Sequence, residues 1–199
     1  MPLPTVLPVL RTPRLVLRAL VPADADAVFR LFSHPEVMRY WSCAPWTEHA
    51  EATRFIEKDA EALAAGTWLR WGWVLSDGDR AGTVIGACGL FALDAENRTA
   101  EIGYLLARDA WGHGYAAEGV DAVLRYGFET LGLRRVEADI DPRNAASVRL
   151  CERAGFRYEG LLRERWHVND EVCDTAFYGL LRREWLPQPH GRPPHVRSG

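Results

Sequence analysis

The stretch of sequence that decides the fold is WGHGYAAEG, residues 111–119. Residues 99–106 before it (TAEIGYLL) predict a strand, and residues 116–131 after it predict a helix. A glycine-rich turn between a strand and a helix presents successive backbone N–H groups at the positive end of the helix. Such a turn binds anions, most often phosphate. The sequence therefore predicts a binding site for a phosphorylated ligand.

Length and composition indicate one compact domain. The chain has 199 residues, of which 48% are hydrophobic, and this is enough to build a sizeable core. The net charge is −3, from 24 basic and 27 acidic residues without a basic stripe, so nucleic acid is not expected as a direct ligand. We find no apolar run of membrane-spanning length and no signal-peptide layout in the first residues, which predicts a cytoplasmic protein.

The cysteines point to a reducing compartment. Cys43, Cys88, Cys151 and Cys173 are widely spaced and form no CxxC pair. Free thiols are therefore expected in place of disulfides or a zinc site, and no metal site is expected.

The first half of the chain predicts helices followed by an antiparallel meander. Residues 1–9 carry three prolines and are expected to be a loose lead-in. Asp24 or its neighbour is the expected N-cap of the first helix, Thr47 is that of the second, and Gly66 is the expected end of the second. The predicted strands are 14–19, 68–76, 83–92 and 99–106, and the predicted helices are 22–33 and 47–65. Short turns join the last three of these strands, which predicts an antiparallel arrangement.

The second half predicts the rest of one α+β domain over residues 10–186. Gly132 and Gly155 are stop signals for helices 116–131 and 145–154. The predicted strands are 135–140, 156–158, 161–168 and 175–181, with a turn at Asn169-Asp170. Residues 187–199 are rich in proline and lack apolar periodicity, so they are expected to be disordered. The predicted fold class is α+β (mixed α/β), a mainly antiparallel sheet with helices on both faces.

The glycine-rich turn also fits part of a dinucleotide-binding pattern, Gly112-x-Gly114-x-x-Ala117. That pattern belongs to the first strand–helix unit of a parallel sheet, whereas a predicted antiparallel meander precedes this one. There is also no GK[ST] sequence of a Walker loop. A turn that binds nothing is a further alternative.

The pattern resembles the acyl-CoA N-acyltransferases of the GNAT superfamily over nearly the whole chain. The family's pyrophosphate loop, Gln/Arg-x-x-Gly-x-Gly/Ala, corresponds to WGHGYA at residues 111–116. Tryptophan at its first position is typical of the RimJ/RimL-like branch, which contains the ribosomal-protein N-terminal acetyltransferases. Further matching segments follow in the expected order: LRTPRLVLRALVPADADAVF, HPEVMRYW, AEIGYLL, NAASVRLCERAGFRYEG and VNDEVCDTAFYGLLRREW.

The resemblance implies acetyl-CoA as co-substrate. In such a fold strand 99–106 splays from strand 135–140, and the pantetheine chain lies in the gap. Gly114 lacks a Cβ and lets a phosphate approach the backbone, whereas His113 could simply face solvent. The implied cofactor-binding residues are Leu105, Leu106, Trp111, Gly112, His113, Gly114, Tyr115, Ala116 and Asn144. Asn144 could also act as the N-cap of the helix that follows it.

The resemblance also implies candidate catalytic residues. Glu101 is the family-level choice for the general base, although it could instead be a structural acid paired with an arginine. Glu164 is the runner-up, and Tyr178 is either a site hydroxyl or a core residue. Ser147 is the candidate to protonate the leaving thiolate, or a simple helix-start serine. The tyrosine that many family members use for this step is replaced here by Cys151.

The acceptor is expected to be a primary amine. Deprotonating an α-amine at pH 7 costs about 1.4 kcal/mol, whereas a lysine amine costs about 4.6 kcal/mol. This difference favours the N-terminal α-amine of a protein, such as a ribosomal protein. A small amine (an amino acid, a polyamine or an aminoglycoside) and a non-catalytic CoA-binding regulator remain as alternatives. A homodimer is expected only by family analogy.

The acceptor wall is expected in the front part of the chain, residues 32–73. This segment holds Met38, Tyr40, Trp41, Trp46, Trp68, Trp71 and Trp73. For Trp71 and Trp73, which alternate along a predicted strand, the sequence favours the core over the acceptor wall.

Overall fold

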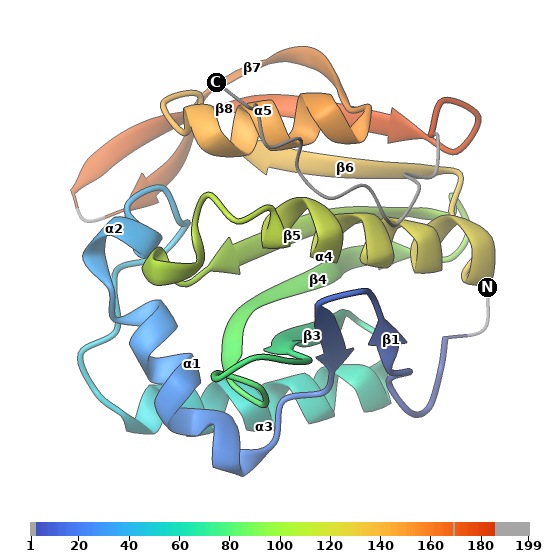
Figure 1. The fold of residues 1–199 in the computed structure, drawn as a ribbon. Helices are drawn as coiled ribbons and strands as arrows, with labels where there is room; N and C mark the ends of the chain where they lie inside the picture. Colours follow the sequence, from blue (N-terminus) through green and yellow to red (C-terminus); the bar gives the residue numbers. More distant parts are fainter. Residues whose placement is uncertain (1–2, 169, 186–199) are drawn as a thin grey trace, which may run out of the picture.

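A single eight-stranded sheet organises the chain, whose structure is a computed structural model that describes residues 3–168 and 170–185 (Figure 1). The strand order is β1-β2-β3-β4-β5-β6-β8-β7, and β5–β6 is the one parallel pair within these residues. The strands are β1 (Leu10–Arg11), β2 (Leu15–Arg18), β3 (Leu69–Leu75), β4 (Val84–Asp94), β5 (Thr99–Leu106), β6 (Arg135–Ile140), β7 (Arg157–Val168) and β8 (Glu171–Leu181). The prediction of a mainly antiparallel sheet is confirmed.

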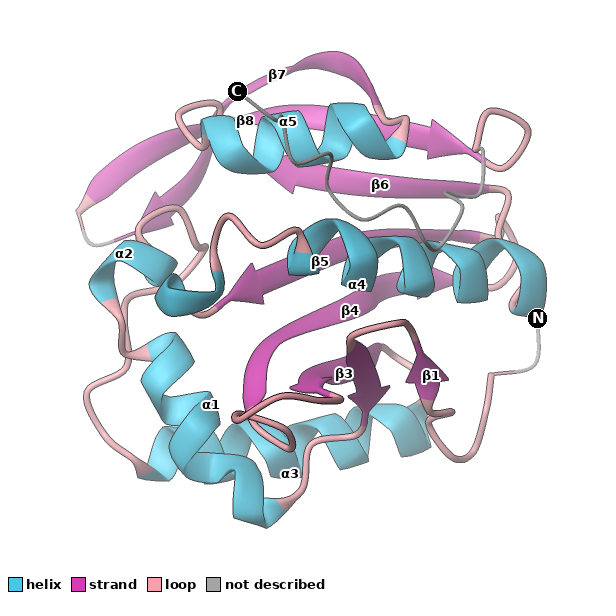
Figure 2. Cartoon of the chain, viewed as in Figure 1, coloured by secondary structure: helices cyan, strands magenta, loops and turns pink. Residues whose placement is uncertain are grey.

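Helices cover both faces of this sheet (Figure 2). They are α1 (Ala25–Phe32), α2 (Pro35–Met38), α3 (Ala50–Ala65), α4 (Tyr115–Arg125) and α5 (Ala145–Ala154). Two buried clusters define the faces: the larger one contains side chains of α4 and α5, and the smaller one contains side chains of α1, α2 and α3.

Alternation along the strands assigns each side chain to one face. In β5, Ile102 and Leu106 belong to the cluster of α4 and α5, whereas Leu105 belongs to the cluster of α1–α3. Glu101 and Gly103 therefore face the side of α1–α3. Trp71 and Trp73 have no exposed surface, which confirms their interpretation as core residues.

Strands β5 and β6 pair over three residues only. The parallel register joins Thr99, Ala100 and Glu101 of β5 to Arg135, Val136 and Glu137 of β6. Beyond Glu101, β5 pairs with β4 on one side, and β6 pairs with β8 on the other. The expected splay of the middle strands is therefore present, and it begins at Glu101.

Several helix ends differ from the sequence prediction. Helix α3 begins at Ala50 and not at Thr47, because the Glu51 carboxylate accepts hydrogen bonds from the amides of Thr47 and Glu48. The Asp24 carboxylate does not cap α1: it accepts from the amide of Val21 and pairs with Arg18. The predicted helix 116–131 is α4 followed by a π-helical turn, Tyr126–Thr130.

Other differences lie at the edges of the sheet. The two predicted strands 156–158 and 161–168 are one strand, β7, with register shifts near Gly160 and after Leu162. β1 was not predicted, since it has two residues. Residues 3–9 form no helix or strand, yet Leu7 is buried and the carbonyl of Pro8 accepts a hydrogen bond from the Trp71 indole. Asn169 and the predicted disordered tail at 187–199 lie outside the described residues.

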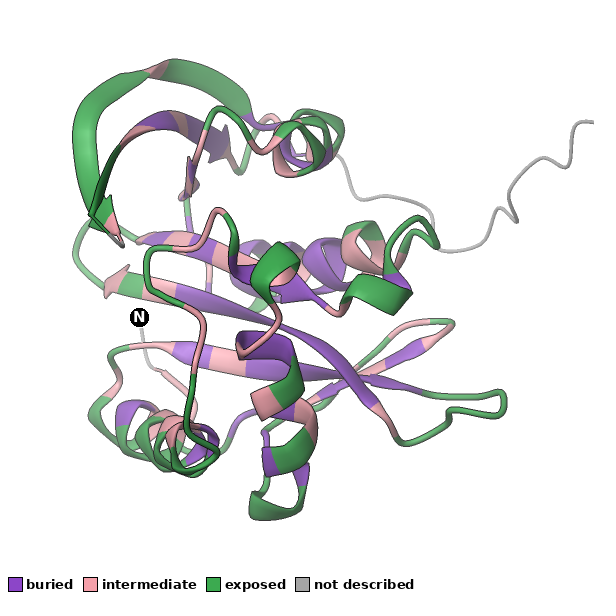
Figure 3. Cartoon of the chain, turned by 90° about the vertical axis from the view of Figure 1, so that its left-hand side faces the viewer, coloured by how far each residue is buried: buried purple, intermediate pink, exposed green. Residues whose placement is uncertain are grey.

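The edge strand β7 is largely exposed (Figure 3). None of the helices in residues 3–168 and 170–185 is long and apolar enough to cross a membrane.

Candidate functional site

The glycine-rich turn forms the start of α4. Gly112 and Gly114 have φ values of +79° and +81°, a conformation that glycine adopts at little steric cost. The first amides of a helix have no intrahelical partner. In the described residues, the amides of Gly112, His113 and Gly114 also make no backbone hydrogen bond. This turn therefore has free donors for an anion.

A charged contact with the turn between β1 and β2 holds the glycine-rich turn in place. The Glu118 carboxylate accepts hydrogen bonds from the hydroxyl of Thr12 at 2.6 Å, and from the amide and Nε of Arg14 at 2.8 and 2.7 Å. Arg14 Nη1 in turn donates to the carbonyl of His113 at 2.8 Å. The sequence analysis missed this contact because 104 residues separate Arg14 from Glu118.

A groove of about 580 Å³ runs from this turn along the splayed edge of β5. It is lined by Leu105 and Leu106 on one side and by Asn144 and Ser147 on the other. The predicted residues of the turn, except His113 and Tyr115, also line it: Trp111, Gly112, Gly114 and Ala116. His113 is exposed, and its ring stacks on Tyr115 with centroids 5.9 Å apart.

The Leu106 carbonyl and the Asn144 side chain, which line the groove, already have hydrogen-bond partners within the protein. The Trp111 indole donates to the carbonyl of Leu106 at 2.8 Å, so one acceptor site of that carbonyl is occupied. Asn144 Oδ1 accepts from the amide of Ser147 at 3.1 Å, which confirms Asn144 as the N-cap of α5. Asn144 still lines the groove.

Tyr104 adds a hydroxyl to this groove that the sequence analysis did not consider. Its hydroxyl lies 3.4 Å from the carbonyl of Ser147 and 3.6 Å from Cys151 Sγ. Burial raises the pKa of Tyr104 well above its usual value, so this phenol stays protonated. Burial also raises the pKa of Cys151, to about 11.

A second cavity, of about 470 Å³, adjoins the groove on the α1–α3 side of the sheet. The two share residues at the splay: Tyr40, Trp41, Ile102, Gly103, Asp139 and Asp141. Met38, Tyr40 and Trp41 line this cavity as predicted for an acceptor wall. Trp46 instead stacks on Phe32, and Trp68 donates to Asp59, so neither lines the cavity.

Glu101 projects into this second cavity at the point where β5 leaves β6. Its carboxylate makes no hydrogen bond or ion pair with the described residues, so no arginine among them is paired with it. Burial raises the pKa of Glu101, and the charges of Asp139 and Glu137 raise it further, while Arg165 opposes them. A carboxylate with a raised pKa beside a cavity is suited to accept a proton.

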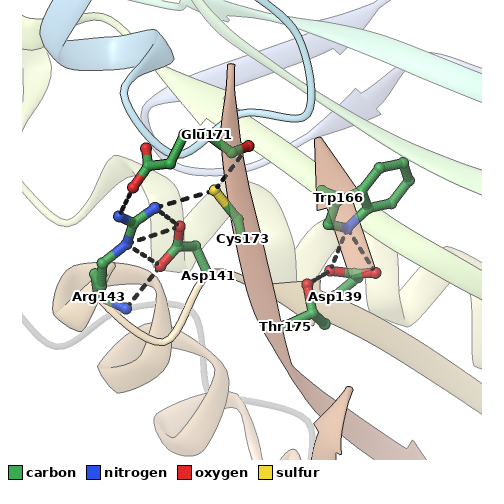
Figure 4. Close-up of polar contacts among 7 residues, drawn as sticks. All are labelled: Asp139, Asp141, Arg143, Trp166, Glu171, Cys173 and Thr175. Carbon is green, nitrogen blue, oxygen red and sulfur yellow. Dashed lines mark hydrogen bonds and ion pairs between the residues drawn. The ribbon is translucent and has the colours of Figure 1, made fainter. Parts of the chain in front are cut away.

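Asp139 lies next to Glu101 and is held in place by β7 and β8. Its carboxylate accepts from the hydroxyl of Thr175 at 2.5 Å and from the indole of Trp166 at 3.2 Å (Figure 4). Glu137 and Asp139 alternate along β6 and Asp141 directly follows that strand, a period of two that was visible in the sequence.

Arg143 closes the far side of the cavity. Its guanidinium donates to Asp141, to Glu171 and to Cys173 Sγ, and so joins the segment after β6 to β8 (Figure 4). Its charge is therefore balanced by two carboxylates.

The remaining candidates lie outside the two cavities. Glu164 is exposed on β7, with a φ of +53°. Tyr178 is buried and packs edge-on against Tyr158 with ring centroids 5.7 Å apart, which agrees with its interpretation as a core residue.

Residues 14–157 match the family profile described as an acetyltransferase (GNAT) domain. The chain is 37% identical over 176 residues to an uncharacterized N-acetyltransferase, p20, of Bacillus licheniformis, covering 88% of this chain and 97% of that protein. It is 38% identical over 104 residues to a putative ribosomal N-acetyltransferase, YdaF, of Bacillus subtilis, covering 52% and 57%.

The fold is similar to a solved structure of spermidine N-acetyltransferase from Vibrio cholerae in complex with CoA and spermine. The TM-score is 0.74 at 25% identity, with 85% of this chain and 96% of that chain covered. The profile match spans well over half of the chain, and the p20 similarity spans most of it. This chain therefore belongs to the GNAT acetyltransferase family and is an N-acetyltransferase.

Proposed function

We propose that the protein transfers the acetyl group of acetyl-CoA to a primary amine by direct attack, with the N-terminal α-amine of a protein as the leading acceptor. One observation carries this proposal: the groove and the second cavity meet at the splay of β5 and β6, and Glu101 lines the second cavity with no hydrogen-bond or ion-pair partner among the described residues. The second cavity is called the acceptor cavity below.

The groove fits acetyl-CoA by its chemistry. The free amides from Gly112 to Ala116 suit a pyrophosphate at the positive end of α4. Within the part of the chain that the structure describes, the edge of β5 at Leu105 and Leu106 has no neighbouring strand on the β6 side, and its backbone groups suit the amides of pantetheine. Asn144 can donate its side-chain NH₂ into the groove, because its Oδ1 is the atom that caps α5. The CoA in the Vibrio cholerae structure supports this assignment.

Glu101 then takes a proton from the acceptor ammonium, and the freed amine attacks the thioester carbonyl carbon. An N–C bond forms, the C–S bond breaks, and the thiolate of CoA leaves. Ser147, with the Tyr104 hydroxyl beside its carbonyl, lies on the groove side, where this thiolate can be protonated. The second amine proton goes to solvent.

Two observations favour a second candidate acceptor, a polyamine. The acceptor cavity contains five acidic side chains (Glu101, Asp139, Asp141, Glu171 and Asp174) against three arginines (Arg39, Arg70 and Arg143). The Vibrio cholerae structure contains spermine. The lower cost of deprotonating an α-amine, about 1.4 against 4.6 kcal/mol, still favours the α-amine.

Release of free thiol from acetyl-CoA against a panel of amines tests the proposal. The panel contains peptides with free Ala or Ser termini, single amino acids, spermidine and an aminoglycoside. Turnover with the peptides supports the α-amine, and turnover only with spermidine supports the second candidate. Measurable acetyl-CoA binding without turnover of any amine overturns the proposal and indicates a CoA-binding regulator.

The contact between Glu118 and the turn that joins β1 to β2 gives a testable prediction about acetyl-CoA binding. Glu118→Gln removes a buried charge from three hydrogen bonds, so we expect unfolding free energy to fall by about 1–3 kcal/mol. Because this contact fixes the turn, we expect KM for acetyl-CoA to rise about threefold to tenfold with kcat little changed. Steady-state kinetics and thermal unfolding measure both effects.

Glu129→Gln is the matched control, because Glu129 is an exposed partner of Arg125 at 3.7 Å on the turn after α4. We expect it to change neither quantity measurably. An unchanged KM in Glu118→Gln would show that the turn does not depend on this contact.

The pair of Asp139 and Glu101 gives a prediction about pH. The charge of Asp139 is the second cause, after burial, of the raised pKa of Glu101. Asp139→Asn keeps an oxygen for Thr175 but removes this charge, so the pKa of Glu101 falls. Since the base acts when deprotonated, the acidic limb of the kcat/KM profile is expected to move to lower pH.

The profile is measured with one peptide between pH 5 and 9, beside the control variant Asp94→Asn, which removes a carboxylate from the last residue of β4. An acidic limb that stays in place, or moves to higher pH, would exclude electrostatic coupling between Asp139 and the base.

A further inference from the structure

Arg70 of β3 reaches the acceptor cavity from the side opposite to Asp139. The strand registers pair Arg70 with Gly89, and Gly89 with Gly103. Paired residues project from the same face, so Arg70 shares its face with Gly103 and with Glu101 two residues away. Two strand spacings and a two-residue step separate the Cα atoms of Arg70 and Glu101 by roughly 12 Å. Two long side chains of opposite charge thus point into one cavity from two ends.

Apolar rings lie between these two ends. Phe91 is the register partner of Glu101, and its ring centroid lies 5.1 Å from the Arg70 guanidinium. Gly89 and Gly103 make room for this ring: a Cβ at Gly89 would lie 2.5 Å from Phe91 Cζ. Met38 and Trp41 also line the cavity. The cavity therefore has a cation at one end, an apolar middle and acids at the other end.

The Arg70 guanidinium is only partly used by the protein. Its Nη1 donates to Asp59 Oδ1 at 2.7 Å, and its face packs 4.0 Å from the Phe55 ring centroid. Its Nε and Nη2 make no hydrogen bond among the described residues, and neither is a fully buried atom. Arg70 lines the cavity, and these two donors have no competing partner among the described residues.

A purely structural ion pair would use more of the hydrogen-bond donors of the arginine and both acceptor oxygens of the carboxylate. Arginine and a carboxylate pair best through two parallel hydrogen bonds. Here Asp59 Oδ1 accepts hydrogen bonds from both Arg70 and the Trp68 indole, whereas the buried Asp59 Oδ2 has no hydrogen-bond partner among the described residues. The pair thus leaves one edge of the guanidinium free for another carboxylate.

The other two arginines of the cavity are less suited to this role. Arg143 is already balanced by Asp141 and Glu171. Arg39 is exposed and packs over the ring of Tyr40 with its guanidinium carbon 5.1 Å from the centroid. Arg70, with 15% of its side chain exposed, is the desolvated cation.

We propose that Arg70 binds a carboxylate of the acceptor, so that the preferred acceptors carry a carboxylate on a short carbon chain near the reacting amine. This rests on the proposed acetyl transfer and sharpens its acceptor class: the amine lies at Glu101, the carbon chain lies on Phe91, and the carboxylate docks on Arg70. Such a site disfavours a polyamine as acceptor, because a polyamine would bring a second cation next to Arg70.

Matched acceptors test this with the wild-type protein. Asp-Ala-Ala amide and Asn-Ala-Ala amide form the peptide pair, and aspartic acid α-amide and asparagine amide form the small-molecule pair. Each pair differs only in a carboxylate and a carboxamide. We expect kcat/KM to be about tenfold or more higher for the carboxylate, the effect of one charge-assisted hydrogen bond. A larger carboxylate preference in the peptide pair indicates a peptide acceptor, and a larger preference in the small-molecule pair indicates a small acceptor.

A matched pair of variants assigns the preference to Arg70. Asp59→Asn removes the ion pair but keeps the guanidinium, so we expect the preference to persist. Asp59→Asn with Arg70→Gln leaves no unpaired buried charge, and we expect the ratio of kcat/KM values to fall to about one. This ratio does not depend on the fraction of folded protein.

Turnover without a carboxylate preference in the wild type, or a preference that persists in the double variant, overturns the inference but not the acetyl transfer. The absence of turnover with every amine overturns both. Should the double variant fail to fold, Arg70→Lys keeps the charge without the planar fork, and an unreduced preference there would contradict bidentate docking.

Discussion

Glu101→Gln is expected to lower kcat/KM for acetyl transfer to a peptide α-amine by about 10²–10⁴-fold at pH 7, the range of general-base catalysis. Glu101 lines the acceptor cavity at the start of the splay of β5 and β6, and its carboxylate has no hydrogen-bond or ion-pair partner among the described residues. Gln is nearly isosteric but cannot accept a proton. Because the substitution leaves the groove intact, we expect the affinity for acetyl-CoA to change little.

The loss should depend on pH. Above about pH 8 an α-amine is already deprotonated in solution, and a base becomes less important. The difference between wild type and Glu101→Gln is therefore expected to shrink from pH 6 to pH 9. Rates come from thiol release, and acetyl-CoA affinity comes from calorimetry.

Glu164→Gln is the matched control, since Glu164 is an exposed acid on β7 outside both cavities. We expect its rate to equal that of the wild type. An undiminished rate in Glu101→Gln across this pH range would remove Glu101 as the base, and a loss confined to Glu164→Gln would transfer the role to Glu164.

Local patterns predicted much of the fold. β5, β6 and α5 have the predicted bounds, because alternation fixes the strands and Gly155 ends the helix in a left-handed conformation with φ +97°. Helix α3 begins three residues later than predicted, and the Glu51 carboxylate in its first turn accepts hydrogen bonds from the amides of Thr47 and Glu48. The sequence does not show that a side chain inside the helix folds back onto these two amides.

The sequence predicted those parts of the candidate site that lie on a single strand or turn. Alternation placed Glu101 on the face of Gly103, and the glycine-rich turn indicated a phosphate site. Contacts between distant segments were not predictable: Arg70 meets Asp59 through the packing of α3 on β3, and Asp139 meets Thr175 through the pairing of β6 with β8. The position of a side chain in such a pair depends on strand order, which alternation does not determine.

Gly114→Val is expected to raise KM for acetyl-CoA about 30-fold or more, which corresponds to about 2 kcal/mol of lost binding. Gly114 adopts φ +81° directly before α4, where the free amides meet the positive end of the helix. A β-branched residue at positive φ is strained, and its methyl groups would stand where the pyrophosphate must approach the amides. One or two charge-assisted hydrogen bonds, at about 1.5–3 kcal/mol each, account for this loss.

The control variant Gly78→Val separates the effect of backbone strain from the loss of acetyl-CoA binding. Gly78 has a φ of +74° in the exposed turn between β3 and β4, and a Cβ there would meet nothing within 4 Å. A Cβ at Gly114 would have only an ordinary contact with Arg14 Nη2 at 3.5 Å. Both variants should therefore lose about 1–2 kcal/mol of stability from the left-handed backbone. Only Gly114→Val should also lose acetyl-CoA affinity, and equal KM values in the two variants would mean that the turn does not hold the pyrophosphate.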